Sequence, residues 1–214
     1  MGMGRPREFD ADVALDRAME VFWRHGYEGA TIAQLTEAMG INPPSLYACF
    51  GNKEGLLKAA LDRYTKLRGA WMDEVVSAPT AREVAERMLM GIAEKQTDPA
   101  NPPGCLLVQG GIATGAGSEN VPFELAARRA QNEEQLRERF VRAQAEGDLK
   151  DTSDPAALAR YVSAVSVGMG VMASSGSDRE ALRQVADVAV QAVEAQSERD
   201  QAVNSLSGRP HNVR

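Results

Sequence analysis

The sequence predicts an all-α protein of about nine helices. Aliphatic residues and alanines recur at the 3.6-residue spacing of helices that bury one face. Clusters of Val, Ile and Thr, which are typical of strands, are few in this chain of 214 residues. Cap residues (Ser, Thr, Asp or Asn) and terminating glycines recur along the whole sequence. The length is sufficient for one or two domains with a buried core.

The first 50 residues predict three helices. The first begins after Asp10, which follows the staple residue Phe9, and ends at Gly26. The stretch "TIAQ", residues 31–34, has the spacing of a capping box and opens a short second helix that ends at Gly40. A third helix begins three residues later. Two short helices joined by a tight turn that contains glycine are typical of a helix-turn-helix.

The rest of the chain continues in the same way. A fourth helix, capped by Asn52, is expected from Lys53 to about Val76. The stretches "DPANPPG" and "GAGSENVP" should break the chain. An apolar segment, residues 105–114, lies between these two breaks. Further helices are predicted after Thr80 with Glu83, over 123–146 up to Gly147, after Asp154-Pro155 and after Ser177 with Glu180. The polar segment 197–214 is predicted to be frayed or disordered.

The composition argues against several functions. The two cysteines, Cys49 and Cys105, have no metal-site spacing, and with His25 and His211 alone a histidine-based triad or metal site is excluded. No apolar run marks a signal peptide, and the longest uncharged stretch, residues 161–176, is too short to span a bilayer. The chain is therefore predicted to be cytoplasmic and non-enzymatic, with no cofactor, no metal and no membrane partner.

The third helix has an unusual outward face. Leu46 and Phe50 lie four residues apart and can be buried, with Ile41 preceding them. Asn42 and Pro43 compete as the N-cap, and prolines in a first turn cost little because those N–H groups have no partner in the helix. The residues left on the outward face are Pro43, Pro44, Ser45, Tyr47 and Ala48.

This face suits DNA, although a simple turn followed by core residues is the alternative. Two rigid pyrrolidine rings can press on thymine methyl groups in a major groove. Ser45 and Tyr47 can donate to phosphates, and Thr31 and Lys53 lie at helix N-termini that favour anions. The basic stretch "GRPR" holds Arg5 and Arg7, which either reach a minor groove or belong to a disordered start.

The net charge restricts the kind of DNA binding. The chain carries a formal charge of −6, and residues 1–55 hold five basic and eight acidic side chains. Few cations are available to replace counterions, so non-specific affinity should be modest and its dependence on salt shallow. We therefore expect an operator-binding protein that uses two half-sites, rather than one that coats nucleic acid.

Residues 9–57 resemble the DNA-binding domain of TetR/AcrR-family transcriptional regulators. The resemblance is carried by "ATIAQLTEAMGINPPSLYACFGNKEGLL", with its Thr start, Gly turn, Leu-Tyr pair, Phe and Lys-Glu-x-Leu-Leu close. It implies that Thr31, Tyr47 and Lys53 hold phosphates. It also implies that Asn42, Pro43, Pro44, Ser45 and Ala48 approach bases. Cys49 stands where many members have a side chain that can approach DNA, and Ala33 lacks the polar group that some members have there.

The resemblance also implies a second helical domain that binds a small ligand and dimerises. The predicted division is 1–53 for DNA binding and 54–196 for ligand binding and dimerisation. Apolar residues of the last two helices are the predicted homodimer interface, although core within one chain is the alternative. They are Leu158, Tyr161, Val165, Met169, Leu182, Val185, Ala189 and Val193.

The ligand pocket is expected among the helices of residues 54–147. Its predicted lining is Tyr64, Arg68, Trp71, Met88, Ile92, Gln109 and Phe123, each of which could instead be ordinary core. Cys105 is interpreted as a small buried residue, with a thiol that senses oxidants or electrophiles as the alternative.

Together these features predict a ligand-responsive regulator, a repressor that binds an inverted-repeat operator in double-stranded DNA as a homodimer and leaves it when a small-molecule effector binds. The alternative is a non-catalytic helical adaptor that uses the first domain for protein contacts.

Overall fold

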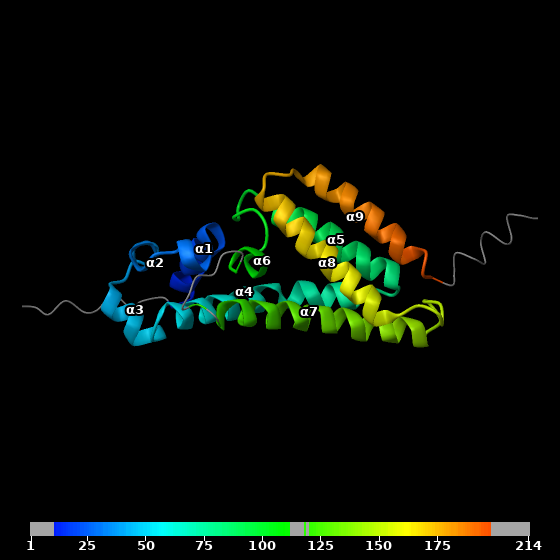
Figure 1. The fold of residues 1–214 in the computed structure, drawn as a ribbon, viewed down its shortest axis with the longest axis horizontal. Helices are drawn as coiled ribbons and strands as arrows, with labels where there is room; N and C mark the ends of the chain where they lie inside the picture. Colours follow the sequence, from blue (N-terminus) through cyan, green and yellow to red (C-terminus); the bar gives the residue numbers. More distant parts are fainter. Residues whose placement is uncertain (1–10, 112–117, 119, 198–214) are drawn as a thin grey trace, which may run out of the picture. The chain divides into compact units, whose positions relative to one another are not determined.

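The computed structural model describes residues 11–111, 118 and 120–197, and these residues form nine helices and no strand (Figure 1). In the described part, the all-α prediction is confirmed. One isolated antiparallel bridge joins Leu149 to Ser197, so the predicted tail begins with a residue that is buried. Arg5, Arg7, Phe9, Asp10 and residues 198–214 lie outside the described residues. The helices are α1 Ala11–Gly29, α2 Ile32–Met39, α3 Pro43–Phe50, α4 Lys53–Val76, α5 Ala81–Gln96, α6 Leu106–Gln109, α7 Asn120–Ala145, α8 Pro155–Ser174 and α9 Arg179–Glu194.

Local cap chemistry sets most helix starts. The side chains of Thr31, Thr80 and Asp154 accept hydrogen bonds from backbone N–H groups at the starts of α2, α5 and α8, as predicted. The prediction for α9 was wrong: Asp178, and not Ser177, is its N-cap and accepts from the N–H of Ala181. The N–H of Ser177 bonds instead to the carbonyl of Met172, so Ser177 belongs to the end of α8.

Helix α1 continues three residues past its predicted end. Gly26 has φ 66° and ψ −179°, a conformation that side chains with a Cβ avoid, and it breaks the regular helix where the sequence placed the end. The chain then adds a short helical stretch up to Gly29. The N–H of Tyr27 in that stretch donates to the carbonyl of Gly110, at 3.2 Å. The break at Gly26 therefore directs the end of α1 toward the segment that follows α6.

The chain forms two compact units, and the division between them runs through α4 and α7. Unit 1 holds residues 1–69 and 105–127, and unit 2 holds residues 70–104 and 128–214. The predicted division at residues 53 and 54 follows the end of the helix-turn-helix instead. The difference arises because Leu56, Leu57 and Leu61 of α4 are fully buried in the same core as α1, α2 and α3.

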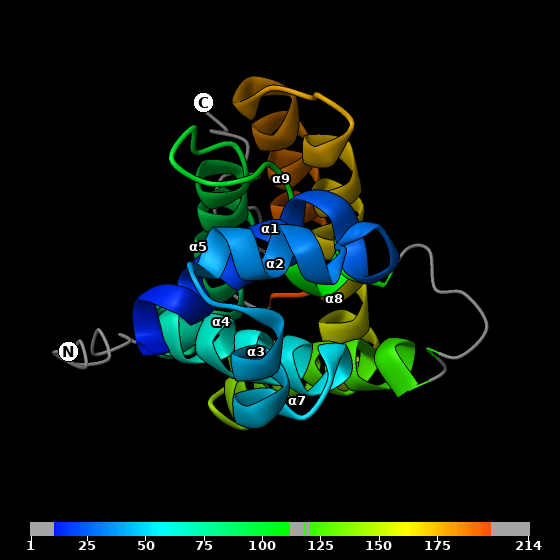
Figure 2. The same ribbon diagram turned by 90° about the vertical axis from the view of Figure 1, so that its left-hand side faces the viewer.

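In unit 1, the first turns of α4 hold the three N-terminal helices in place (Figure 2). Phe22, Leu35 and Leu46, from α1, α2 and α3, are fully buried in its core. An ion-pair cluster ties α1 to α4 at the surface. Arg63 forms a bidentate pair with Asp16, both bonds at 2.9 Å, and reaches Asp12 at 2.8 Å. These carboxylates raise the pKa of Arg63, so the guanidinium stays charged.

In unit 2, α5 packs against both α8 and α9 (Figure 1). The buried guanidinium of Arg139 donates twice to the carbonyl of Ala78, at 3.1 and 2.7 Å, and burial lowers its pKa. Buried Asp148 accepts from the N–H of Ala81 at 2.6 Å. Helix α7 is therefore hydrogen-bonded to the turn before α5, and the turn after α7 is hydrogen-bonded to the first residue of α5.

Within the described residues, α8 is the one helix long and apolar enough to cross a membrane by length and composition, with 33% of its apolar window buried. From the sequence, the longest uncharged stretch, residues 161–176, was expected to be too short to span a bilayer. The apolar helix begins six residues earlier, at Pro155, and includes Arg160 as its charged residue. In this fold it packs against α5 and α9.

Candidate nucleic-acid interface

The cap of α3 leaves its first turn free to face outward. Asn42 is the N-cap: its Oδ1 accepts from the N–H of Ser45 at 2.9 Å. Pro43 and Pro44 occupy the first two helical positions, where no intrahelical N–H is needed. The two rings therefore form the tip of α3 without costing it a hydrogen bond.

Burial separates the two faces of α3 clearly. Leu46 is 0% exposed, whereas Tyr47 is 47% exposed. Ile41 and Phe50 are half-buried and pack against the core of unit 1. The outward positions are Asn42, Pro43, Pro44, Ser45, Tyr47, Ala48 and Cys49, all of them exposed. Fully buried Leu46 and half-buried Phe50 thus anchor a helix whose other side chains are exposed.

Thr31 caps α2 through a complete capping box. Its Oγ1 accepts from the N–H of Gln34 at 3.2 Å and donates to Gln34 Oε1 at 2.9 Å, and Oε1 also accepts from the N–H of Thr31. The hydroxyl proton is therefore already used within the box. An anion at this helix end would meet the first-turn N–H groups of Ile32 and Ala33.

Lys53 provides a positive charge at the start of α4. The preceding residue, Asn52, accepts from the N–H of Gly55 at 2.7 Å and so caps the helix. The Lys53 ammonium lies over the ring of Tyr27, with Nζ 4.4 Å from the ring centroid. Burial lowers the pKa of Lys53, and the nearby charge of Glu28 opposes that shift.

Charge is sparse on the helix-turn-helix itself. The sequence of α3 has no charged residue, and α2 has only Glu37, which is exposed. What the face offers is two helix N-termini, the hydroxyls of Ser45 and Tyr47, and Lys53. This arrangement can hold phosphate oxygens by directed hydrogen bonds while an apolar tip enters a groove.

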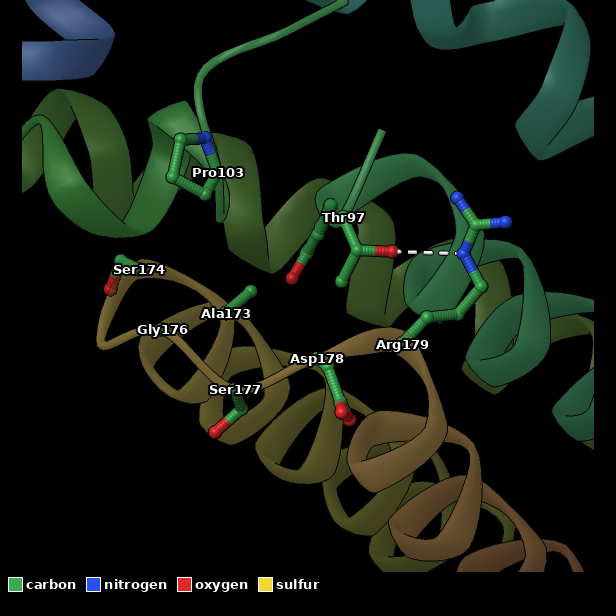
Figure 3. Close-up of a pocket in the computed structure, with 9 residues that line it drawn as sticks. Thr97, Pro103, Ala173, Ser174, Gly176, Ser177, Asp178 and Arg179 are labelled. Atoms are coloured by element: carbon green, nitrogen blue, oxygen red, sulfur yellow. Dashed lines mark hydrogen bonds between the residues drawn. The ribbon is translucent and has the colours of Figure 1, made fainter. Parts of the chain in front are cut away.

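A cavity of about 560 Å³ lies in unit 2 where α5 and α8 end and α9 begins (Figure 3). Arg179 closes one side, with its Nε 3.1 Å from Thr97 Oγ1 and its Nη1 2.9 Å from Glu94. Gln96, 2% exposed, also contributes to the wall, and its Oε1 has no hydrogen-bond partner. None of the predicted ligand-lining residues contributes to this cavity.

A second cavity of unit 2, of about 640 Å³, contains one predicted lining residue, Trp71. The Trp71 ring lies so close to α5 that a Cβ on Gly91 would be 2.9 Å from it, and Lys95 lies 5.4 Å from the ring centroid. Val75 and Met90 complete an apolar floor, and a charged rim surrounds it. The rim residues are Glu74, Arg87, Glu94 and Arg183.

The other predicted lining residues lie elsewhere. In unit 1, Tyr64 is buried, its ring meets that of Trp23 edge to face with centroids 5.3 Å apart, and its hydroxyl is 3.5 Å from Cys105 Sγ. Arg68 lies over the Tyr64 ring at 4.7 Å. Gln109 is half-buried, while Phe123 is 75% exposed and so faces away from any core. In unit 2, Met88 and Ile92 are buried in the α5 core.

The predicted dimer residues are mostly inside their own chain. Because the core of unit 2 buries them, these five cannot form a surface: Leu158, Met169, Leu182, Ala189 and Val193. Val165 and Val185 are half-buried against the same core, and only Tyr161 is exposed. The sequence misled because α8 is apolar on nearly every side, so its spacing does not tell inside from outside.

A different apolar face remains exposed on α8 and α9. On α8 it recurs at helical spacing, and on α9 it includes Val188, which is 66% exposed. Its members are Ala157, Tyr161, Ala164, Val167, Gly168, Val171, Val188 and Ala192. The prediction named only Tyr161 of this face, although small residues recur at helical spacing at Ala157, Ala164 and Gly168 and were available as a signal.

Comparisons with known proteins agree with this geometry. The profile of "Bacterial regulatory proteins, tetR family" matches residues 14–60. The chain is 36% identical to the HTH-type transcriptional repressor ComR of Escherichia coli (strain K12), over 86% of this chain and 88% of that protein. It is 30% identical to the uncharacterized HTH-type transcriptional regulator YezE of Bacillus subtilis (strain 168), over 88% and 98% of the two chains.

Among solved structures, a cysteine-substituted form of the TetR family transcriptional regulator CifR, complexed with 26-base-pair operator DNA, is 43% identical to this chain. The TM-score is 0.84, and the match covers 88% of this chain and 99% of that one.

Proposed function

The chain belongs to the tetR family of bacterial regulatory proteins, and on that premise we propose that it is a transcriptional repressor, active as a homodimer on an inverted-repeat operator. It is a DNA-binding regulator and not an enzyme. A small-molecule effector releases it from the operator. It acts in the cytoplasm, where its operator is.

The observation that carries the proposal is the outward face of α3. A helix that buries one leucine and exposes two prolines, a serine and a tyrosine gains little from packing. Its surface is explained by a groove that accepts apolar rings and a backbone that accepts hydrogen bonds. Thr31 at α2 and Lys53 at α4 mark the two ends of the proposed phosphate contact. Arg5 and Arg7 stay proposed as a minor-groove arm.

The exposed face of α8 and α9 is our proposed dimer contact, in place of the buried residues predicted from sequence. Glycine and alanine at positions 157, 164 and 168 allow two helices to approach closely. Tyr161, Val171 and Val188 would lose their exposed apolar area on association. In such a dimer the exposed apolar face of α8 is covered by the second protomer and not by a membrane.

For the effector, we propose the cavity at Trp71. The ring, Val75 and Met90 can cover an apolar molecule, and the charged rim can orient a polar group on it. An effector that prefers a wider spacing of the recognition helices weakens DNA binding by that preference, typically about 1–3 kcal/mol. Operator binding itself requires the two α3 helices about 35 Å apart, one turn of the major groove.

The deciding experiment is selection of the purified protein on a random duplex DNA library, followed by sequencing. We expect an inverted repeat, with an affinity that falls only shallowly as salt rises. If no motif emerges while a DNA-binding relative yields its own in parallel, the adaptor interpretation replaces this one. The recovered repeat then serves as the probe for an effector screen, in which Trp71→Ala should reduce release but not DNA binding.

A further inference from the structure

Lys53 has a rigid aromatic support beneath it. Its Nζ lies 4.4 Å from the centroid of the Tyr27 ring, which is 8% exposed. Tyr27 in turn stacks on fully buried Phe22, with centroids 6.3 Å apart and an interplanar angle of 11°. The ring therefore has little freedom to move, whereas a lysine side chain alone has many rotamers.

This contact would matter at the moment of phosphate binding. A lysine that must be ordered by its ligand loses conformational entropy, which weakens the contact. An ammonium already attracted to a ring face loses less, and its other N–H donors still point away from the ring. Burial first, and then the charges of Glu54 and Glu28, raise the pKa of Tyr27, so the ring stays an uncharged phenol.

The acidic neighbour of Tyr27 acts in the opposite direction. Glu28 raises the pKa of Lys53 against the effect of burial, which means that its carboxylate attracts the same ammonium. The hydroxyl of Ser118 is hydrogen-bonded to Glu28 Oε1 and holds that carboxylate. A DNA phosphate at Lys53 would have to compete with this charge and would itself be repelled by it.

We propose that Tyr27 is a positioning residue for DNA binding, which holds Lys53 ready for a phosphate, and that Glu28 weakens the same contact. The proposal rests on the proposed function, since it requires Lys53 to meet operator DNA. It adds two residues of α1 to that interface, neither of which needs to touch DNA.

The test measures operator affinity over a range of salt for Tyr27→Phe and Tyr27→Leu, each made in the wild type and in Lys53→Ala. Phenylalanine keeps the ring and should stay within about twofold of wild type, whereas leucine should weaken binding by about 3- to 10-fold. In Lys53→Ala, which has lost this phosphate contact, the slope of log affinity against log salt concentration should become shallower by about one per half-site. With Lys53 already removed, the leucine variant should cost nothing further.

Glu28→Gln tests the second half of the proposal and keeps Tyr27 intact. We expect operator binding about 2- to 3-fold tighter, and a smaller gain in the Lys53→Ala background, where only the direct repulsion between Glu28 and the phosphate remains. Glu20→Gln, an exposed acid on the same helix, is the matched control for a general change of charge and should gain less.

Equal losses for Tyr27→Leu in both backgrounds would show a merely structural role and overturn the proposal. If circular dichroism shows that Tyr27→Leu does not fold, Glu28→Gln becomes the deciding variant. An operator affinity equal to that of the wild type for Glu28→Gln would also overturn the proposal. A wild type that selects no DNA motif would instead sink the proposed function, so the two failures are distinct.

Discussion

Two regions of this chain expose apolar surface, and they differ in what surrounds it. On α3 the exposed prolines and Tyr47 form a short tip beside the hydrogen-bond donors of two helix N-termini and near Lys53. On α8 and α9 the exposed apolar residues form a long stripe, with small residues between larger ones. The first suits a polyanion with a groove, and the second suits an identical helix pair. The neighbours of an apolar patch, more than its size, indicate its partner.

The largest effect should come from a charge on the long stripe. Val171→Glu places a carboxylate where two protomers would meet, and an unpaired buried charge costs about 3–5 kcal/mol. Sedimentation should show monomers, and operator affinity should fall by about 100-fold or more because the two DNA-binding domains are no longer linked to each other. Gln131→Glu adds the same charge to an exposed position of α7, outside the stripe, and should leave the dimer intact. A monomeric variant with full affinity would contradict the dimer requirement.

The next effect concerns the residue that holds the short tip in place. Leu46→Ala removes the one fully buried side chain of α3 and should lower the free energy of unfolding by about 2–4 kcal/mol. Chemical denaturation would measure it. Cys49→Ala, an exposed change on the same helix, should stay within about 0.5 kcal/mol of wild type. Equal stability for the two variants would mean that α3 is not anchored as described.

The same substitution on each surface separates their roles. Tyr47→Ala should weaken operator binding by about tenfold, because it removes both a phosphate donor and an aromatic ring, and should leave the dimer unchanged. Tyr161→Ala should instead raise the dimer dissociation constant. Binding by fluorescence anisotropy and sedimentation, run on both variants, would check the pair. If Tyr161→Ala impaired DNA binding with dimers intact, the assignment of the two surfaces would be wrong.

The smallest effect should follow removal of the α3 cap. Asn42→Ala removes the hydrogen bond to the N–H of Ser45 and should cost about 1 kcal/mol of stability, with a several-fold loss of operator affinity. Asn42→Ser keeps a capping oxygen and should recover most of the stability in a thermal melt. If serine recovered both stability and affinity, Asn42 would act as a cap alone and would not contact bases.

The parts of the fold that depend on neighbouring residues could be predicted from the sequence. Thr31 and Asp154 cap their helices through contacts two or three residues away, and Leu46 was identified because one side of a short helix must be buried. At α9 the same kind of signal pointed one residue too early: Asp178 accepts from the N–H of Ala181, while Ser177 lies in the turn that ends α8 and donates its N–H to Met172.

The errors lie where distant elements decide burial. Helix α8 is apolar on most sides, so only its packing on α5 and α9 shows that Met169 is inside and Val171 outside. Phe123 was predicted to line a pocket from its type, yet nothing in the α7 sequence shows that its side faces outward. Trp71 lines a cavity because Gly91, twenty residues away, lacks a side chain.

The self-contained caps of α2 and α3 have a consequence for evolution and for engineering. Asn42 and Leu46 hold α3 in position, while Ser45, Tyr47, Ala48 and Cys49 are exposed and do not belong to the buried core of unit 1. Mutations at those four positions can therefore be sampled freely without unfolding the protein. A combinatorial library at these sites, selected on altered operators, should yield orthogonal repressors, and natural duplicates of this gene could diverge by the same route.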